Sequence, residues 1–160
     1  MQSVTYKPIG IIHTPFKNLS DAPIQPSAGR GEAGRVELFP QYAEGLQDLD
    51  RFSHIILIYH FHLSGTYSLR VKPFLDDQMR GLFATRAPAR PNRIGHSVVR
   101  LQAIESNILS VQNVDMLNGT PLLDIKPYVP EFDRHEPVKT GWLQDRIGTL
   151  PGKRGDTRFG

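Results

Sequence analysis

The chain has 160 residues, no cysteine and a formal net charge of +3. This length suits one domain with a real core, and the lack of cysteine excludes disulfides, thiolate metal sites and cysteine nucleophiles. The 13 prolines and 14 glycines favour a β fold with many turns over a helical bundle. We see no signal-peptide pattern, and the longest apolar run, His54–Leu63, is about half of the roughly 20 residues that span a membrane. We therefore expect a soluble, cytoplasmic protein.

The first half of the chain predicts short strands separated by loops. A β-branched segment, Lys7–His13, is ended by Pro15, and a long loop follows from Asn18 to Gly34. Arg35–Phe39 alternates polar and apolar residues, as a half-buried strand does. Pro40 then opens a short helical turn.

The strongest strand signal is Ser53–Leu63, which we expect to be central and buried on both faces in its first half. Of the segments that follow, Arg80–Thr85 is predicted as a short strand and Ala87–Gly95 as a rigid loop. Ser97–Glu105 and Ile108–Val114 are predicted to form a hairpin, and Pro121–Lys126 a last strand. After Pro130 we expect an irregular polar arm that Trp142 could anchor. Such short strands, punctuated by glycine and proline, suggest a small β-barrel.

Positive charge is concentrated between Gln78 and Arg100. This stretch contains no Asp or Glu but five arginines: Arg80, Arg86, Arg90, Arg93 and Arg100. Arginine suits bidentate contacts with phosphate or carboxylate. The stretch therefore indicates a nucleic-acid or anionic-ligand surface, and the alternative is a solvated face on which arginine stems cover apolar area.

Two short motifs have weak support. Gly29–Gly34 matches the dinucleotide pattern G-x-G-x-x-G, but a Pro-rich loop precedes it and a strand follows, which argues against a Rossmann site. His60 and His62 are expected on one face of a strand, like a metal-binding pair of a cupin barrel, but no acidic residue follows among residues 63–67. We interpret this pair as lining a pocket rim, with a metal site as the alternative.

Two longer segments carry the strongest functional signal. In Phe83–Ser97, Pro88 and Pro91 stiffen a loop, and a stiff loop loses little entropy when it binds a ligand. Leu117–Tyr128 combines a turn with Asp124, which lies between Leu123 and Ile125 and needs hydrogen bonds if it faces inward. Ordinary turn chemistry around a barrel is the alternative for both segments.

Four blocks in order, PIGIIHTPF, FSHIILIYHFH, GLFATRAPARPNRIGHSVVRL and NGTPLLDIKPYVPEFD, resemble the TrmO family. The resemblance runs from about Tyr6 to Phe132. These proteins are S-adenosylmethionine-dependent methyltransferases acting on tRNA. The resemblance implies a mainly β fold, a small barrel that is neither Rossmann nor knotted, with short helices and an irregular C-terminal arm. It implies a barrel domain at 1–132, an arm at 133–160, and a homodimer.

The resemblance also implies methyl transfer to the exocyclic nitrogen of threonylcarbamoyladenosine, which lies beside the anticodon of tRNA. The implied S-adenosylmethionine-binding residues are Gln25, Pro26, Ser27, His62, Leu63, Arg86, His96, Asn118, Gly119, Thr120 and Pro121. Many relatives have Asp at position 118; Asn118 keeps the hydrogen-bonding capacity of that residue but not its charge.

Combining the resemblance with the charge pattern gives two residue-level hypotheses. The tRNA contacts are expected among Arg80, Arg90, Arg93 and Arg100, while Arg86 faces the cofactor. The acceptor nitrogen must lose a proton, and Asp124 is a candidate base, with orientation of a backbone turn as its alternative role.

Three other functions stay open from the sequence. One is a non-catalytic module that binds S-adenosylmethionine or RNA. Another is a metalloenzyme that uses His60 and His62. The third is a methyltransferase of the same fold with a different acceptor.

Overall fold

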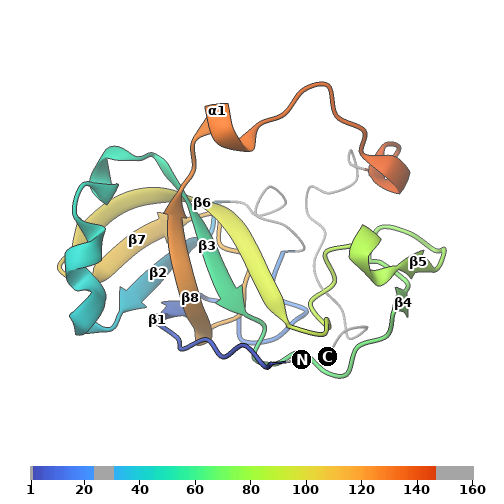
Figure 1. Ribbon diagram of the computed structural model, residues 1–160, viewed down its shortest axis with the longest axis horizontal. Coiled ribbons are helices and arrows are strands. Elements are labelled where there is room, and N and C mark those ends of the chain that lie inside the picture. Colours follow the sequence, from blue (N-terminus) through green and yellow to red (C-terminus); the bar gives the residue numbers. More distant parts are fainter. Residues whose placement is uncertain (1, 24–30, 147–160) are drawn as a thin grey trace.

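The computed structural model describes residues 2–23 and 31–146. Six antiparallel strands close a barrel in the order β1-β2-β7-β6-β3-β8 (Figure 1). Their bounds are β1 Gly10–His13, β2 Ala33–Leu38, β3 His54–His60, β6 Ile94–Glu105, β7 Ile108–Gln112 and β8 Thr120–Pro127. The predicted small β-barrel is confirmed. A strand, β2, follows Gly31, whereas a Rossmann site would need a helix there.

The interior of the barrel is filled by alternate residues of each strand. Eight of them have no exposed surface: Ile12, Val36, Ile55, Leu57, Val99, Leu109, Val111 and Leu122. On β3 the alternation is strict, with Ile55, Leu57 and Tyr59 buried and Ile56 and Ile58 only half-buried. The expectation that the first half of this strand is buried on both faces is therefore wrong, because in a closed barrel only one face of each strand points into the core.

Strands β6 and β7 form the predicted hairpin. Ser106 and Asn107 make the turn, and Ser106 takes a left-handed backbone conformation (φ 58°). Asn107 Nδ2 donates a 2.6 Å hydrogen bond to the carbonyl of Leu38. The turn is thereby tied to the end of β2, the other strand beside β7.

A small lobe lies beside the barrel, at the right of Figure 1. It contains the two-stranded sheet of β4, Arg70–Val71, and β5, Arg80–Gly81, followed by the 3₁₀ helix η4, Leu82–Ala84. The predicted strand Arg80–Thr85 is wrong beyond Gly81, because the chain turns into η4 there. A separate apolar cluster fills the lobe: Val71, Leu82, Ala87 and Ala89, with Phe74 packed against it.

Short helices make the remaining connections. The 3₁₀ helices η2, Pro40–Leu46, and η3, Leu49–Arg51, join β2 to β3, so the helical turn expected at Pro40 is confirmed. After β8 the chain forms α1, Pro130–Asp133, and then runs across to the lobe, where η5 spans Gly141–Leu143 (Figure 1). No helix in the described part of the chain is long and apolar enough to cross a membrane.

The segment after α1 is anchored on the lobe. Trp142 Nε1 donates a 2.8 Å hydrogen bond to the carbonyl of Ala84, as its expected anchoring role requires. Arg146 donates to the carbonyl of Leu75 at 3.2 Å and lies 3.2 Å from a carboxylate oxygen of Asp76. These contacts hold the segment beside the space between lobe and barrel.

Candidate functional site

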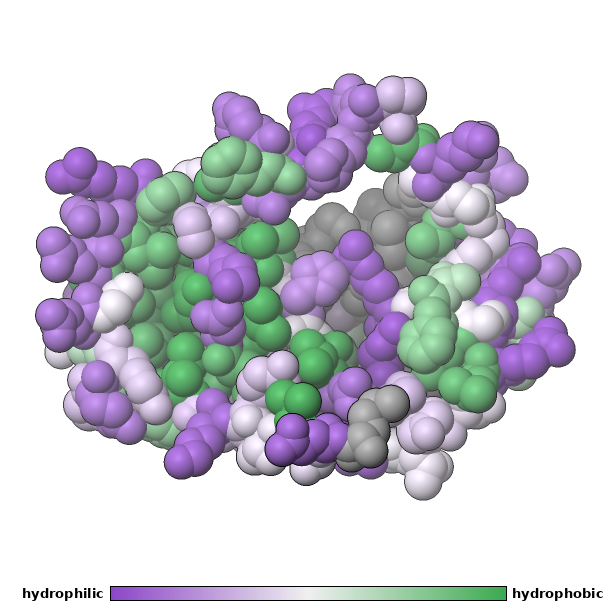
Figure 2. Space-filling view, in the orientation of Figure 1, coloured by the Kyte–Doolittle hydropathy of each residue, from purple (hydrophilic) through white to green (hydrophobic). Residues whose placement is uncertain are grey.

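A pocket of about 720 Å³ lies between one end of the barrel and the lobe. Its walls come from the end of β3, the loop before β6, the start of β6, residues 115–117 and the segment around Trp142. In the space-filling view, the surface is hollowed below the segment that runs from α1 to the lobe, and hydrophilic residues border the opening (Figure 2). The volume is typical of a site for a small molecule or cofactor.

Aromatic side chains form the apolar part of the pocket. Tyr59 and Phe61 pack edge to face with ring centroids 5.3 Å apart. Gly95 is opposite Tyr59 in the β3–β6 pairing, and a Cβ atom at this position would lie 2.7 Å from Cζ of Phe61. Glycine is thus required at position 95 for the two rings to approach β6. Phe74 and Phe83 face the same pocket from the lobe.

A hydrogen-bonded chain of three side chains runs to the pocket from the barrel interior. Ser97 Oγ donates to Asp115 Oδ1 at 2.6 Å, and the Tyr59 hydroxyl lies 2.9 Å from Ser97 Oγ. Because Ser97 uses its single proton for Asp115, Tyr59 donates to Ser97. The chain links β3 and β6 to the segment after β7.

Asp115 has an unusual electrostatic environment for a carboxyl group. Burial raises its pKa to about 7, against the lowering effects of the Ser97 hydrogen bond and the Arg86 charge. Burial also raises the pKa of Tyr59 above its ordinary value. Asp115 therefore titrates near neutral pH, as residues that move protons do.

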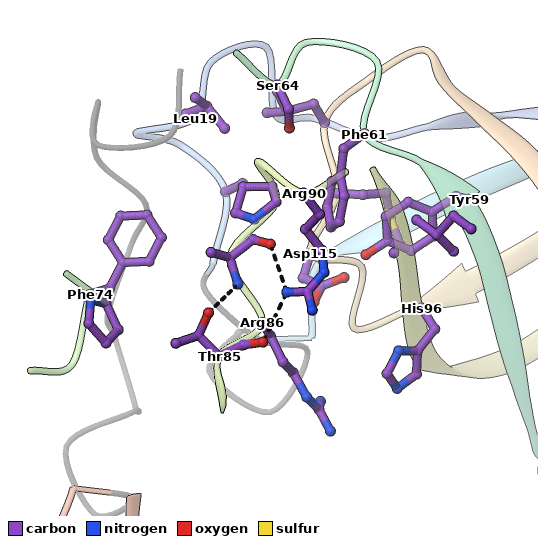
Figure 3. Close-up of a pocket in the computed structure, with 18 of the residues that line it drawn as sticks. Leu19, Tyr59, Phe61, Ser64, Phe74, Thr85, Arg86, Arg90, His96 and Asp115 are labelled. Carbon is purple, nitrogen blue, oxygen red and sulfur yellow. Dashed lines mark hydrogen bonds between the residues drawn. The ribbon is translucent and has the colours of Figure 1, made fainter. Parts of the chain in front are cut away.

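Arg86 brings positive charge to the pocket next to Asp115. Its charge lowers the pKa values of Asp115 and His96, and burial is the larger cause of the lowered pKa of His96. Figure 3 shows Asp115 between Tyr59 of β3 and the loop that carries Arg86 and Arg90. A guanidinium at this place can bind a carboxylate or phosphate group of a ligand.

Arg90 holds the loop that lines the pocket in shape. Its Nη1 donates to the carbonyls of Thr85 at 3.0 Å and Ala87 at 3.2 Å (Figure 3). Its guanidinium carbon lies 5.8 Å from the centre of the Phe83 ring. The loop between η4 and β6 is thus stiffened by Arg90 as well as by its prolines.

The other arginines predicted to contact tRNA are spread over the molecule. Arg80 Nε donates to Asp76 Oδ2 at 2.7 Å, and this contact holds the pKa of Asp76 below its ordinary value. Arg93 is half-buried, with a left-handed backbone (φ 45°). Arg100 is exposed on β6, six residues beyond Ile94 and so about 20 Å along the strand. Of the four, Arg90 alone lines the pocket among the described residues.

The structure brings together some of the predicted cofactor-binding residues. His62, Leu63, Arg86, His96 and Thr120 line the pocket. Three others are not among its lining residues: Asn118, Gly119 and Pro121. Gln25, Pro26 and Ser27 lie outside the described residues.

Asn118 and Gly119 make backbone contacts at the start of β8. Asn118 Oδ1 accepts a 3.1 Å hydrogen bond from the Thr14 amide, and the Gly119 amide donates to the carbonyl of Ile12 at 2.9 Å. Both residues therefore connect the start of β8 to β1 beside the pocket. The side-chain oxygen of Asn118 accepts the hydrogen bond from Thr14 without the charge that an aspartate would bring.

Asp124, the predicted base, is not among the residues that line the pocket. Its carboxylate is about half-exposed on β8, 2.9 Å from Lys126 Nζ, and it accepts a hydrogen bond from the Ile125 amide at 2.9 Å. These contacts match the alternative role of orienting local backbone. Its part in catalysis stays a prediction, and the carboxylate that the structure brings into the pocket is Asp115.

Sequence reasoning missed Asp115, Ser97 and Tyr59. One signal could have found Asp115: it stands between Val114 and Met116, two apolar residues, as Asp124 stands between Leu123 and Ile125. The partners could not be found this way, because Tyr59 and Ser97 are 38 residues apart in the chain and meet only through strand pairing.

The histidine pair is separated by the end of a strand. β3 ends at His60, so His62 lies beyond the alternating strand face, where it lines the pocket. Burial and the neighbouring His60 both lower the pKa of His62. Within the part of the chain that the structure describes, no three His, Cys, Asp or Glu side chains group as a metal site.

Comparison with known proteins decides the family. Residues 11–134 match the N-terminal domain of tRNA-methyltransferase O. The chain belongs to this family. A probable S-adenosyl-L-methionine-binding protein of Pyrococcus abyssi is 56% identical over 156 residues, which cover 98% of this chain and 85% of that protein. The human tRNA (adenine(37)-N6)-methyltransferase is 34% identical over 139 residues, which cover 82% of this chain and 32% of the human protein.

The fold agrees with solved members of the tRNA-methyltransferase O family. The crystal structure of TrmO from Pseudomonas aeruginosa superposes with a TM-score of 0.74 at 37% sequence identity, over 88% of this chain. The match covers 63% of that chain. The family assigns this protein to the S-adenosylmethionine-dependent tRNA methyltransferases.

The residues of the pocket fit S-adenosylmethionine. The aromatic walls suit an adenine ring. The guanidinium of Arg86 suits the carboxylate of the methionine moiety. S-adenosylmethionine supplies an activated methyl group, and the protein's task is to position it and to exclude water.

Proposed function

We propose that this protein transfers a methyl group from S-adenosylmethionine to the exocyclic nitrogen of threonylcarbamoyladenosine beside the anticodon of tRNA. The observation that carries the proposal is the pocket between barrel and lobe, where Arg86, Asp115 and aromatic side chains surround a space of cofactor size. The name of the human relative, which specifies the N6 atom of adenine 37 of tRNA, supports the choice of acceptor.

Within this proposal, Arg86, His96, His62, Leu63 and Thr120 bind the cofactor from the described part of the site. Asn118, Gly119 and Pro121 act from the start of β8, next to the pocket wall that Thr120 forms. The proposal includes Gln25, Pro26 and Ser27, which lie outside the described residues.

The proposed tRNA surface includes Arg93 and Arg100, together with Arg80 and Arg90. Arg100 is exposed on the outside of the barrel and so can reach a phosphate. Arg80 and Arg90 already make internal hydrogen bonds, and each keeps donor groups for a second partner, since a guanidinium carries five N–H donors.

We further propose that the protein works as a homodimer in the cytoplasm, with residues 1–132 as the barrel domain and 133–160 as an arm. Exposed apolar side chains on the segment after β8, Phe132 and Val138, support an association of this kind. Light scattering would give twice the chain mass of 18.0 kDa for the dimer.

The test is a methylation assay with two matched tRNA samples. One sample carries threonylcarbamoyladenosine beside the anticodon, and the other is the same transcript without that modification. The products are digested to nucleosides and separated by mass spectrometry. We expect methylated threonylcarbamoyladenosine from the first sample and no methylated nucleoside from the second.

The same assay separates the competing functions. Methylation of another nucleoside would assign the same chemistry to a different acceptor. Several archaeal relatives are named only as S-adenosylmethionine-binding proteins. Tight cofactor binding without any methylated product would support a non-catalytic binding module.

A further inference from the structure

We propose that the carboxylate of Asp115 is the base that accepts the proton lost by the acceptor nitrogen. The inference rests on the proposed function and adds a catalytic residue to it. Its basis is placement: Asp115 lines the pocket, and it is the only carboxylate among the described residues that do so.

The position of Asp115 is fixed by its neighbours. Ser97 Oγ holds Oδ1 at 2.6 Å, and Ser97 is itself buried and lies 2.9 Å from the Tyr59 hydroxyl. Tyr59 is in turn packed against Phe61. A carboxylate held in this way keeps one orientation relative to a ligand in the pocket, as a proton acceptor must.

The groups that face Asp115 favour proton uptake by this residue over the histidines of the pocket. Arg86, Tyr59 and Ser97 are its charged and polar neighbours, from the loop before β6, from β3 and from β6. A proton on Asp115 removes a buried negative charge. A proton on His96 would instead create a second positive charge beside Arg86, and a proton on His62 would place one beside His60.

The chemical step balances with Asp115 in this role. The acceptor nitrogen forms a bond to the methyl carbon while the bond between this carbon and the sulfur of S-adenosylmethionine breaks, and the sulfur keeps the electron pair. The N–H proton passes to the carboxylate of Asp115. Solvent then takes the proton after the products leave, which restores the ionised carboxylate.

The electrostatics of Asp115 suit this cycle. Its pKa of about 7 means that near neutral pH a large share of the molecules holds the ionised form, and that the protonated form is easily reached. About one pH unit above this value nearly all of the base is ionised. The rate of methyl transfer is therefore expected to rise with pH, to be half-maximal near pH 7 and to level off above about pH 8.

The experiment compares wild type, Asp115→Asn, Asp124→Asn and Asp77→Asn. Asp124 is the rival base, and Asp77 is a fully exposed surface carboxylate that serves as control. For each protein, single-turnover methyl transfer to modified tRNA is measured from pH 5.5 to 9, and S-adenosylmethionine binding is measured by calorimetry. Carboxyl carbon NMR of the apoprotein follows the titration of Asp115 itself.

We expect Asp115→Asn to lower the single-turnover rate about 10²–10⁴-fold and to abolish its rise with pH, while the Kd for S-adenosylmethionine changes less than threefold. The control variant Asp77→Asn keeps the wild-type rate and profile. An active Asp115→Asn enzyme, or a loss of rate in Asp124→Asn alone, overturns the proposal. So does a large loss of cofactor binding in Asp115→Asn, which would make Asp115 a ligand of the cofactor. A wild type that methylates no tRNA refutes the proposed function instead.

Ser97→Ala gives a test that does not need Asp115 to be replaced. The Ser97 hydrogen bond lowers the pKa of Asp115, so its removal raises this pKa. The rate profile and the NMR titration should then move together to higher pH, and the plateau rate should fall because Asp115 loses the contact that fixes its orientation. A Ser97→Ala profile that stays in place while the NMR titration moves contradicts the assignment.

Discussion

The hydrogen bond from Ser97 Oγ to Asp115 Oδ1, 2.6 Å long, joins the barrel core to the pocket. Ser97 is buried on β6 between the apolar residues of the core, whereas Asp115 follows β7 and lines the pocket. Burial of a carboxyl group costs free energy unless the group is protonated or paired. The same residue that serves the site is therefore expected to destabilise the fold at high pH.

Asp115→Asn is expected to stabilise the folded protein above neutral pH. The folded-state pKa, about 7, lies above the unfolded value of 3.8, so the folded state holds a proton that the unfolded state loses between these values. Stability from this group is present below pH 4 and is lost as pH rises to 7. At pH 8 the buried carboxylate lowers the free energy of unfolding by on the order of 4 kcal/mol, because each unit of difference between the two pKa values corresponds to about 1.36 kcal/mol.

Urea unfolding of wild type and Asp115→Asn between pH 4 and pH 8 checks this prediction. The advantage of the variant should grow up to about pH 7 and then stay constant, with Asp77→Asn showing no such trend. A variant less stable than wild type at pH 8 would mean that Asp115 has a structural role.

Gly95→Ala is expected to damage the pocket and to leave the rest of the barrel intact. The new Cβ atom would meet Phe61 Cζ at 2.7 Å and the Tyr59 ring, and neither ring can move without losing the contact between the two. We expect a loss of about 1–3 kcal/mol of stability, as for other overpacked sites, and weaker binding of S-adenosylmethionine by calorimetry. In Gly81→Ala, where nothing lies within 4 Å of the new atom, both quantities should stay at the wild-type values.

Binding of tRNA should weaken steeply as salt is raised. Each phosphate contact adds close to one unit to the slope of log K against log salt. Arg100→Ala should reduce that slope by about one, measured by filter binding between 50 and 200 mM salt. Arg35→Ala, which removes an exposed arginine paired with Glu37, is the control and should leave the slope unchanged. Equal slopes for wild type and Arg100→Ala would remove Arg100 from the tRNA surface.

Trp142→Ala is expected to release the segment after α1 from the lobe. The change removes the 2.8 Å bond to the carbonyl of Ala84 and the ring that lies 5.6 Å from the Arg80 guanidinium. Hydrogen exchange should speed up at residues 134–146 and stay slow in β3 and β6. S-adenosylmethionine binding should weaken, because Trp142 and Leu143 line the pocket. Unchanged exchange in this segment would show that Arg146 alone holds it.

The fold was readable from the sequence where strands alternate regularly. Arg35–Phe39, Ser97–Glu105 and Ile108–Val114 each carry a period of two, and each forms a strand at nearly the expected bounds. Arg80–Thr85 was misread because the start of a strand and a 3₁₀ turn are both short and partly apolar. Their difference depends on pairing with Arg70–Val71, which local pattern does not reveal.

Only part of the site could be predicted from the sequence, for a similar reason. The stiff loop with Arg86 and the pocket position of His62 and His96 followed from sequence and resemblance. The choice between Asp115 and Asp124 did not, because both stand next to apolar residues and only the closed barrel turns Asp115 to the pocket. Partners that are far apart in the chain, such as Ser97 and Asp115, are brought together by the register of strand pairing, which the local sequence pattern does not reveal.

Calorimetric titration of S-adenosylmethionine into wild type and Arg86→Ala tests the central claim most directly. We expect one site per chain for wild type and a Kd at least tenfold weaker for Arg86→Ala, since the variant loses the guanidinium that faces the pocket. At a cofactor concentration of 100 times Kd, wild type should gain about 2.7 kcal/mol of stability. Absence of binding to the wild type, or equal binding by both proteins, would contradict the assignment of this pocket to the methyl donor.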